Sequence, residues 1–221
     1  MLTELPATIE PPEGSASWGS AAVDHPMRAV TRAVAFEPDG WTPARQAEVI
    51  ALFDSLAPEW NTRDVAGREL PILDALDRGV AAAPPRDAGG FALELGGGTG
   101  LYSAAMAERF STLLTLDISW EMVRLVPAGP SLRVQGDGSR LPLADGSLDA
   151  IILINMFLFP AEVDRVLAPG GVVVWVNSRG PETPIHLLAS EVDQALPGRW
   201  DGVASTAGWG TWSVHWRAVA G

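Results

Sequence analysis

A glycine-rich heptapeptide, Glu94-Leu95-Gly96-Gly97-Gly98-Thr99-Gly100, most constrains what this chain can fold into. It overlaps the end of the apolar run Phe91–Leu95, which is typical of a buried strand, and it precedes a helical stretch over 101–109. Glycines let a backbone turn tightly and let a ligand approach without a Cβ in between. Such a turn between a strand and a helix predicts an α/β domain that binds a ligand at the turn.

From residue 91 onwards, short apolar runs alternate with helical stretches. Strands are predicted over 91–95, 112–116, 132–134, 150–154 and 172–176, and helices over 101–109, 120–125, 161–167 and 183–196. Pro169-Gly170-Gly171 is expected to turn the chain, and 202–218 is predicted to be a hairpin that turns near Gly208-Trp209-Gly210. Because this alternation places helices on both faces of a sheet, the fold class is predicted to be α/β, doubly wound and mostly parallel.

The first 90 residues divide at about residue 40. Residues 1–40 are rich in Pro, Gly, Ser and Ala and are expected to form a partly ordered N-terminal arm, in which a short helix over 27–36 fits. Residues 41–90 are expected to be a helical lid segment, in which Thr42 caps a first helix opened by Pro43. A second helix is predicted from about residue 70 to 78, stopped by Gly79, and residues 91–221 then form the core.

The composition excludes several kinds of chemistry. The chain has 221 residues, a formal net charge of −12, no cysteine and no lysine, so all 15 cations are arginines. Without cysteine there is no thiolate nucleophile or Cys-ligated zinc, and without lysine there is no Schiff base or P-loop lysine. Because no arginine cluster stands out, we expect no nucleic-acid partner. No signal peptide or membrane-spanning run is visible, which favours a cytoplasmic protein without membrane contact.

The glycine spacing argues against a dinucleotide. The fingerprint G-x-G-x-x-G fails from Gly96 because Leu101 occupies its last position, and it fails from Gly97 because a threonine replaces its second glycine. An acid followed by G-x-G-x-G does fit, with Glu94 as the acid. A carboxylate repels a pyrophosphate but attracts an ammonium, so the turn is predicted to bind a cofactor with a cationic amino-acid end.

Three polar positions follow the next predicted strands. Asp117 ends the second strand, where it can accept hydrogen bonds from ribose hydroxyls, with a helix N-cap as the alternative. Gly136-Asp137-Gly138 follows the third strand, where the acid can bond an adenine amino group, with an Asp-Gly turn as the alternative. Asn155 ends the fourth strand and is expected either to face the reactive end of the cofactor or to make a satisfied core hydrogen bond.

Taken together in this order, these motifs resemble the class I S-adenosylmethionine-dependent methyltransferases, in particular the small-molecule branch that includes the quinone-biosynthesis enzymes. The resemblance covers about residues 53–177. Its pieces are Phe53–Trp60, Leu93–Gly100, Leu116-Asp117-Ile118-Ser119 with Met122, Gly136–Gly138 with Leu141-Pro142, and Arg165–Gly171. Each piece is weak alone, and the collinear set is specific.

The resemblance implies a seven-stranded sheet whose last strand is antiparallel, and S-adenosylmethionine as the cofactor. It implies that Gly96 and Gly98 lie beneath the methionine part, that Asp117 holds the ribose and that Asp137 faces adenine. The cofactor-binding residues expected are Glu94, Gly96, Gly97, Gly98, Asp117, Ile118, Asp137, Gly138 and Asn155.

The predicted function is methyl transfer from this cofactor to a small-molecule acceptor, mainly by proximity and orientation. Two alternatives stay open: a cofactor-binding protein without catalysis, and a nicotinamide-dependent oxidoreductase. His25, His186 and His215 are candidates for a base, although a structural role is the more common one for such residues. No catalytic residue and no metal ligand is assigned.

The choice of acceptor is not predicted. The stretch between the fourth strand and Pro169 is shorter than is usual in the family, and the first 40 residues match none of its motifs. Trp18, Trp41 and Trp60 fall in the arm and the lid, where they are candidates for lining an apolar or aromatic acceptor pocket, with core packing as the alternative. The oligomeric state is likewise not predicted.

Overall fold

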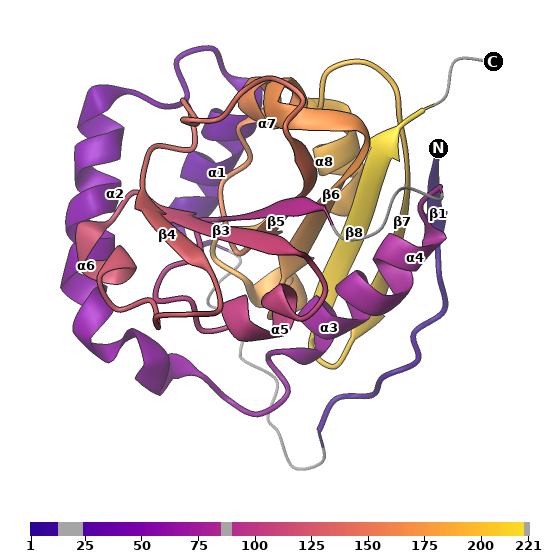
Figure 1. The fold of residues 1–221 in the computed structure, drawn as a ribbon, viewed down its shortest axis with the longest axis horizontal. Helices are drawn as coiled ribbons and strands as arrows, with labels where there is room; N and C mark the ends of the chain where they lie inside the picture. Colours follow the sequence, from indigo (N-terminus) through magenta and orange to yellow (C-terminus); the bar gives the residue numbers. More distant parts are fainter. Residues whose placement is uncertain (13–23, 85–89, 219–221) are drawn as a thin grey trace.

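The computed structural model describes residues 1–12, 24–84 and 90–218. These residues form an α/β sandwich in which helices cover both faces of one sheet (Figure 1). The strands of the sheet are β1 (Leu2–Glu4), β2 (Phe91–Leu95), β3 (Thr112–Asp117), β4 (Leu132–Gln135), β5 (Leu148–Ile154), β6 (Leu167–Asn177), β7 (Trp200–Ala207) and β8 (Gly210–Arg217).

The sheet order is β1-β7-β8-β6-β5-β2-β3-β4. All neighbouring strands pair in parallel except β8, which is antiparallel to both β6 and β7. The predicted doubly wound fold and the antiparallel last strand are therefore confirmed. The sheet has eight strands, not the expected seven, because Leu2–Glu4 from the N-terminal arm adds a parallel edge strand beside β7, with Leu2 opposite Gly202.

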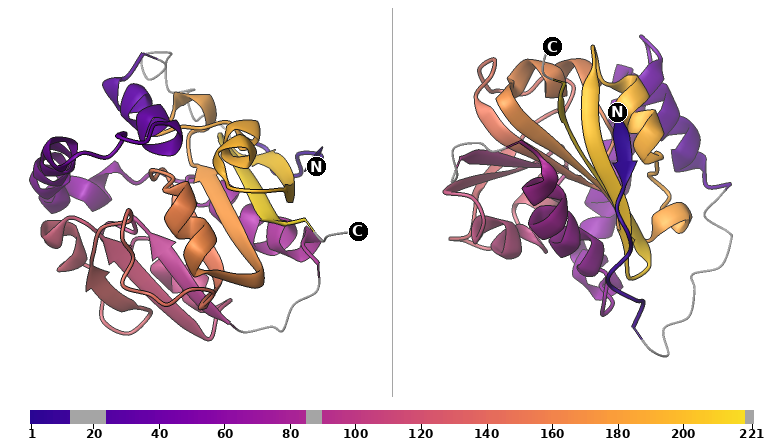
Figure 2. Two further views of the ribbon diagram at one scale, coloured as in Figure 1. Left: turned by 90° about the horizontal axis from the view of Figure 1, so that it is seen from above. Right: turned by 90° about the vertical axis from the view of Figure 1, so that its right-hand side faces the viewer.

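Helices lie on both sides of the sheet in the two views of Figure 2. The sheet packs against one large apolar cluster on each face. One face is covered by α1 (Pro26–Phe36), α7 (Pro160–Val166) and α8 (Ala189–Ala195). The other is covered by α3 (Leu70–Asp74), α4 (Val80–Ala82) and α5 (Ser103–Ala107). Strands buried on both faces read as continuous apolar runs, which explains why β5 is apolar along most of its length.

The first helix of the lid segment begins as the sequence predicts. Thr42 caps α2 (Pro43–Leu56): its Oγ1 accepts a hydrogen bond from the backbone N–H of Arg45 at 3.2 Å, and Pro43 opens the helix. After α2 the chain forms a 3₁₀ turn over Ala57–Arg63. In Figure 1, α2 stands beside α6 (Trp120–Val123) at the edge of the molecule.

Gly79 does not end the second lid helix, contrary to the prediction. The helix continues from α3 through a π-helical turn, Ala75–Gly79, into α4. A Cβ on Gly79 would lie 2.6 Å from a methyl group of Val214 and 2.7 Å from the ring of Trp212. The glycine therefore lets the helix pack closely on β8 and does not serve as a cap.

Two other predicted boundaries are also wrong. Pro169-Gly170-Gly171 belongs to β6, where the pairing with β5 shifts register between Leu148 and Ala150, so these residues form an irregularity inside the strand. The helix expected over 183–196 begins only at Ala189. Pro184 favours extended backbone at the preceding residue, and the stretch up to Leu188 is irregular. Within the described residues, none of the helices combines the length and the apolar character needed to cross a bilayer.

Candidate cofactor and acceptor site

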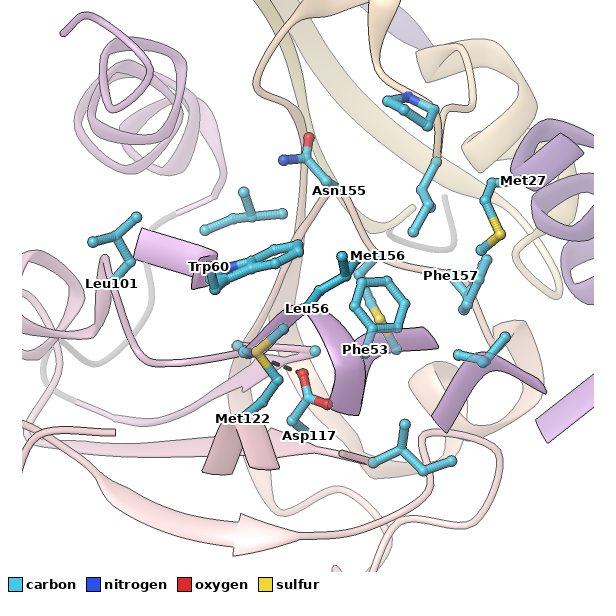
Figure 3. Close-up of a pocket in the computed structure, with 18 of the residues that line it drawn as sticks. Met27, Phe53, Leu56, Trp60, Leu101, Asp117, Met122, Asn155, Met156 and Phe157 are labelled. Atoms are coloured by element: carbon cyan, nitrogen blue, oxygen red, sulfur yellow. Dashed lines mark hydrogen bonds between the residues drawn. The ribbon is translucent and has the colours of Figure 1, made fainter. Parts of the chain in front are cut away.

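A cavity of about 700 Å³ opens at the carboxyl ends of the central strands, beneath α2. In Figure 3, Asp117 and Met122 lie at one end of this cavity, and Asn155 and Met27 lie at the other. Its polar and glycine lining residues include Glu94, Gly96, Gly97, Gly98, Asp117, Gly136, Gly138 and Asn155. Its apolar lining residues include Ile118, Phe53, Trp60, Met122, Met156 and Phe157. The structure thus brings eight of the nine predicted cofactor-binding residues to one cavity.

The glycine turn after β2 uses the conformations that only glycine adopts easily. Gly96, Gly98 and Gly100 have φ values of 70°, 57° and 71°. The turn is held against β3, because the N–H groups of Gly96 and Gly97 donate to the carbonyl oxygen of Leu116 at 2.8 and 3.2 Å. A chain bent this sharply presents backbone to the cavity without side chains in the way.

Glu94 lies beside this turn in a buried position, with 2% of its surface exposed. Its Oε2 accepts hydrogen bonds from Ser103 Oγ at 2.5 Å and from Thr115 Oγ1 at 2.9 Å. Burial raises the pKa of Glu94 to about 7, although both hydroxyl groups oppose the rise. A cation placed in the cavity would favour the ionised form of this carboxyl group.

Asp117 joins the glycine turn to the loop after β3. Its Oδ2 accepts from the N–H of Gly98 and its Oδ1 from the N–H of Ser119, both at 2.9 Å. Burial is the main cause of a raised pKa, and these backbone bonds work against it. Ser119, not Asp117, caps α6, because its hydroxyl accepts from the N–H of Met122 at 3.1 Å. The cap alternative for Asp117 is therefore wrong.

A carboxylate from the lid, which the sequence did not single out, also contacts this loop. Asp54 Oδ1 on α2 accepts a hydrogen bond from Ser119 Oγ at 2.5 Å. The charge of Asp54 adds to the rise in the pKa of Asp117. The lid helix is thus hydrogen-bonded to the strand end that carries Asp117.

Asp137 is the one predicted residue that does not line the cavity, although its neighbours Gly136 and Gly138 do. Its carboxylate accepts from Gln46 Nε2 at 2.7 Å and from Trp41 Nε1 at 3.1 and 3.3 Å. Both donors belong to the start of the lid segment, where the sequence predicts Trp41 as a candidate for the acceptor pocket and predicts no role for Gln46. The Gln46–Asp137 hydrogen bond is thus a second contact of α2 with the strand ends, beside the Asp54–Ser119 bond.

Asn155 lines the cavity, and both polar atoms of its side chain are hydrogen-bonded within the protein. Its Nδ2 donates to Ser178 Oγ and its Oδ1 accepts from the N–H of Ser178, both at 2.8 Å. Its backbone has a φ of 51°, which is uncommon outside glycine. The two expectations for Asn155 are therefore compatible, because the residue bonds its neighbour and faces the cavity.

None of the three histidines both lines the cavity and has a ring nitrogen free to accept a proton from an acceptor molecule. His215 and His186 are buried, burial lowers the pKa of each to about 4, and neither lines the cavity. His25 does line it, but its Nδ1 accepts the N–H of Met27 as the cap of α1. In the neutral ring the proton then resides on Nε2, which makes that nitrogen a donor. Among the described residues, no group of three or more acidic or histidine side chains is arranged to hold a metal ion.

Two of the three tryptophans proposed for the acceptor pocket line the cavity, and the third, Trp18, lies outside the described residues. The Trp60 ring meets Phe53 edge to face, with 5.8 Å between the ring centres. Trp41 contacts Phe157 and Phe159 at 5.7 and 5.4 Å. Both rings therefore pack with lid or strand-end residues as well as facing the cavity.

Three arginines also line the cavity and were not identified from the sequence: Arg63, Arg68 and Arg179. Arg68 Nε donates to Ser178 Oγ at 3.2 Å, which places it next to the Asn155–Ser178 pair. Arg68 and Ser178 are 110 residues apart in the sequence, so only the folded chain brings Arg68 close to Arg179.

Comparison with known proteins agrees with this geometry. A family model described as a methyltransferase domain matches residues 93–175. The chain is 34% identical over 157 residues to the malonyl-[acyl-carrier protein] O-methyltransferase of Dechloromonas aromatica, covering 67% of this chain and 57% of that protein. It is 33% identical over 175 residues to the demethylmenaquinone methyltransferase of Renibacterium salmoninarum, covering 69% of each.

A solved structure described as a complex of DhpI with SAH superposes with a TM-score of 0.61 at 20% identity, covering 81% of this chain and all of that one, which supports the fold. The chain spans little more than half of the length of the relative from Dechloromonas aromatica. The family of the chain follows from its relative from Renibacterium salmoninarum, and the glycine turn with its two buried carboxylates agrees with it. The chain belongs to the class I S-adenosylmethionine-dependent methyltransferases, whose cofactor is S-adenosylmethionine.

Proposed function

We propose that this chain transfers the methyl group of S-adenosylmethionine to a small-molecule acceptor. The observation that carries the proposal is the pair of buried carboxylates, Glu94 and Asp117, on adjacent strands. Both line one cavity on either side of a glycine turn with left-handed backbone. This arrangement suits a ligand that has a cation at one place and hydroxyl groups at another, which describes the amino-acid and ribose parts of the cofactor.

We assign roles to the lining residues as follows. Glu94 attracts the ammonium group, Gly96, Gly97 and Gly98 let the amino-acid part approach the backbone, and Asp117 accepts from the ribose hydroxyls. Ile118 and Gly138 border the nucleoside, and Asn155 borders the methyl-bearing end.

Asp137 differs from the others because its carboxylate is engaged by Trp41 and Gln46. We propose that it contributes to cofactor binding by holding α2 over the nucleoside end of the cavity.

The cofactor supplies an activated methyl group when bound, so the chain's own task is to orient the two reactants and exclude water. Apolar lid residues, with Phe53 and Trp60 among them, cover the cavity and serve this purpose. No general base is needed for an acceptor that has already lost its proton.

The proposal also covers the partners, the location and the domain organisation of the enzyme. A formal net charge of −12 supports a small acceptor and no nucleic-acid partner. We also propose a cytoplasmic location, with 1–40 as an arm, 41–90 as a lid and 91–221 as the cofactor-binding core.

Isothermal titration with S-adenosylhomocysteine tests the proposal directly. We expect saturable binding of one molecule per chain. A sample that melts cooperatively but shows no heat of binding at millimolar ligand would overturn the assignment. Tighter binding of NADH than of S-adenosylhomocysteine would favour an oxidoreductase instead.

A further inference from the structure

Charged side chains of both signs line the cavity, and the acidic ones lie in a different part of it from the basic ones. Among the described lining residues, the carboxylates are Glu94 and Asp117, whereas the arginines are Arg63, Arg68 and Arg179. Three of the 15 cations of a chain with a net charge of −12 thus face a single cavity. An acidic protein repels anions in general, so a local group of guanidinium groups creates a place where an anion is favoured.

Arg68 donates only to neutral hydrogen-bond acceptors among the described residues. Its Nε donates to Ser178 Oγ at 3.2 Å and its Nη1 to the carbonyl oxygen of Arg63 at 3.1 Å, and both acceptors are neutral. None of the ion pairs among the described residues includes Arg68. The residue is half-buried, where a cation without a counter-ion is costly.

Arg179 places a second cation beside the first. It follows Ser178 directly in the chain, after the end of β6, and it is half-buried. Burial and the nearby charge of Arg68 both lower the pKa of Arg179, while the charge of Glu182 partly opposes them. Two guanidinium groups that repel each other at a cavity wall are both stabilised when an anion binds between them.

The position of the arginines along the sheet separates them from the cofactor's nucleoside. In the sheet order β6-β5-β2-β3-β4, Asp117 ends β3 and Gly136 follows β4, so the nucleoside lies over that side. The amino-acid end then points toward β2 and β5. Arg68 and Arg179 adjoin Ser178 after β6, one strand farther on. This is the side left for the acceptor.

We propose that the acceptor carries an oxyanion, either a carboxylate or a phosphate ester, and that Arg68 and Arg179 bind it. The apolar lining around Met27, Met156 and Phe157 accommodates the remainder of such a molecule. The inference rests on the proposed methyl transfer, because it names the class of acceptor for the same site.

Titration of matched probes into the protein saturated with S-adenosylhomocysteine tests the inference. The probes are 3-phenylpropanoate, octanoate and 2-phenylethyl phosphate, together with the primary amides of the two acids as neutral counterparts of the same shape. The variants are R68Q and R179Q, each checked by thermal melting. R140Q is the matched control, since Arg140 is exposed and does not line the cavity.

We expect at least one oxyanion to bind at least tenfold more tightly than the neutral amides in the wild type and in R140Q. R68Q and R179Q should each reduce that preference at least fivefold, while affinity for S-adenosylhomocysteine changes less than threefold. The acid and phosphate arms show which oxyanion is preferred. If R68Q unfolds, R179Q and R68K are used for the test. R68K keeps the positive charge but loses the forked donor geometry of arginine.

Two outcomes would overturn the inference and leave the proposed function standing. One is equal binding of oxyanions and amides by the wild type. The other is a tenfold loss of S-adenosylhomocysteine affinity in R68Q with the probe preference unchanged, which would assign the guanidinium to the cofactor's own carboxylate. Failure of the wild type to bind S-adenosylhomocysteine would instead remove the proposed function.

Discussion

The two ends of the cavity are built in different ways. At the cofactor end, Glu94 and Asp117 come from strand ends. Glu94 accepts hydrogen bonds from β3 and from the start of α5, and Asp117 accepts one from the glycine turn. At the other end, Arg68 precedes a helix and Arg179 follows a strand, and Ser178 links Arg68 to Asn155. The cofactor end therefore depends on short stretches of sequence, whereas the proposed acceptor end forms only when distant segments come together in the fold.

The largest effect expected at the cofactor end comes from Gly98→Val. A β-branched residue at a φ of 57° is strained, and its side chain would enter the cavity toward Trp60, whose Nε1 would lie 3.4 Å from the new Cβ. We expect titration calorimetry to show at least a hundredfold loss of S-adenosylhomocysteine affinity, about 2.7 kcal/mol. Gly129→Val is the control, because Gly129 also has a positive φ but a Cβ added there would meet no atom within 4 Å. Equal losses in both variants would show that backbone strain alone is responsible.

Asp117→Ala removes the proposed partner of the ribose hydroxyls. We expect S-adenosylhomocysteine to bind about 1–3 kcal/mol more weakly. Asp39→Ala, at an exposed position, controls for the loss of one negative charge. Unchanged affinity in a folded Asp117→Ala sample would mean that the ribose lies elsewhere.

Glu94 makes the cofactor end sensitive to pH. Burial raises its pKa to about 7, so the carboxylate is mostly protonated at pH 6 and mostly ionised at pH 8 in the protein without ligand. We expect S-adenosylhomocysteine affinity to rise up to about tenfold over that interval, and Glu94→Gln to flatten the rise.

The stability of the ligand-free protein should change in the opposite sense. Because the pKa of Glu94 in the folded state is above the value of 4.5 expected when unfolded, its stabilising contribution is complete below about pH 4.5 and is lost as pH rises through about 7. Thermal melts of wild type and Glu94→Gln from pH 5 to 8 measure this difference. A wild-type melting temperature that rises relative to Glu94→Gln over this range would contradict the assignment.

The smallest effect is expected from Gln46→Ala, which removes one of the lid's bonds to Asp137 while Trp41 keeps its own. We expect S-adenosylhomocysteine affinity to fall about threefold, in line with the loss of one side-chain hydrogen bond. Tighter binding would instead show that Gln46 competes with adenine for the Asp137 carboxylate. Gln135→Ala, whose Nε2 donates to the carbonyl oxygen of Ile118, is a control for the loss of a glutamine elsewhere on the strand ends.

The same contrast explains what the sequence could predict. The strands, the glycine turn and Asp117 follow from apolar periodicity and from residues adjacent in the chain. The boundaries of β2, β3, β4 and β5 agree with the prediction to within two residues, whereas β6 begins five residues before the predicted strand. β1 was missed because three residues in a proline-rich arm carry no periodic pattern, and they form a strand only by pairing with β7.

The contacts of the lid were missed for a related reason. Nothing in the sequence around Gln46 or Asp54 marks them as partners of Asp137 and Ser119, since these pairs are 91 and 65 residues apart. Likewise Gly79 follows a helical stretch as a cap would, and only its closeness to Trp212 reveals a packing role. Long-range side-chain pairs of this kind require the fold to be known.

The buried carboxylate of Asp74 makes the two halves of the lid segment differ in how they are attached to the sheet. It accepts from the indole N–H of Trp212 at 2.8 Å and pairs with Arg78, which fastens the helix around it to the back of the sheet. The half that contains α2 is held at the strand ends by side-chain contacts, which include the hydrogen bonds of Gln46 and Asp54. The contacts that hold α2 over the cavity can therefore be broken without breaking those that hold the helix around Asp74 to the sheet.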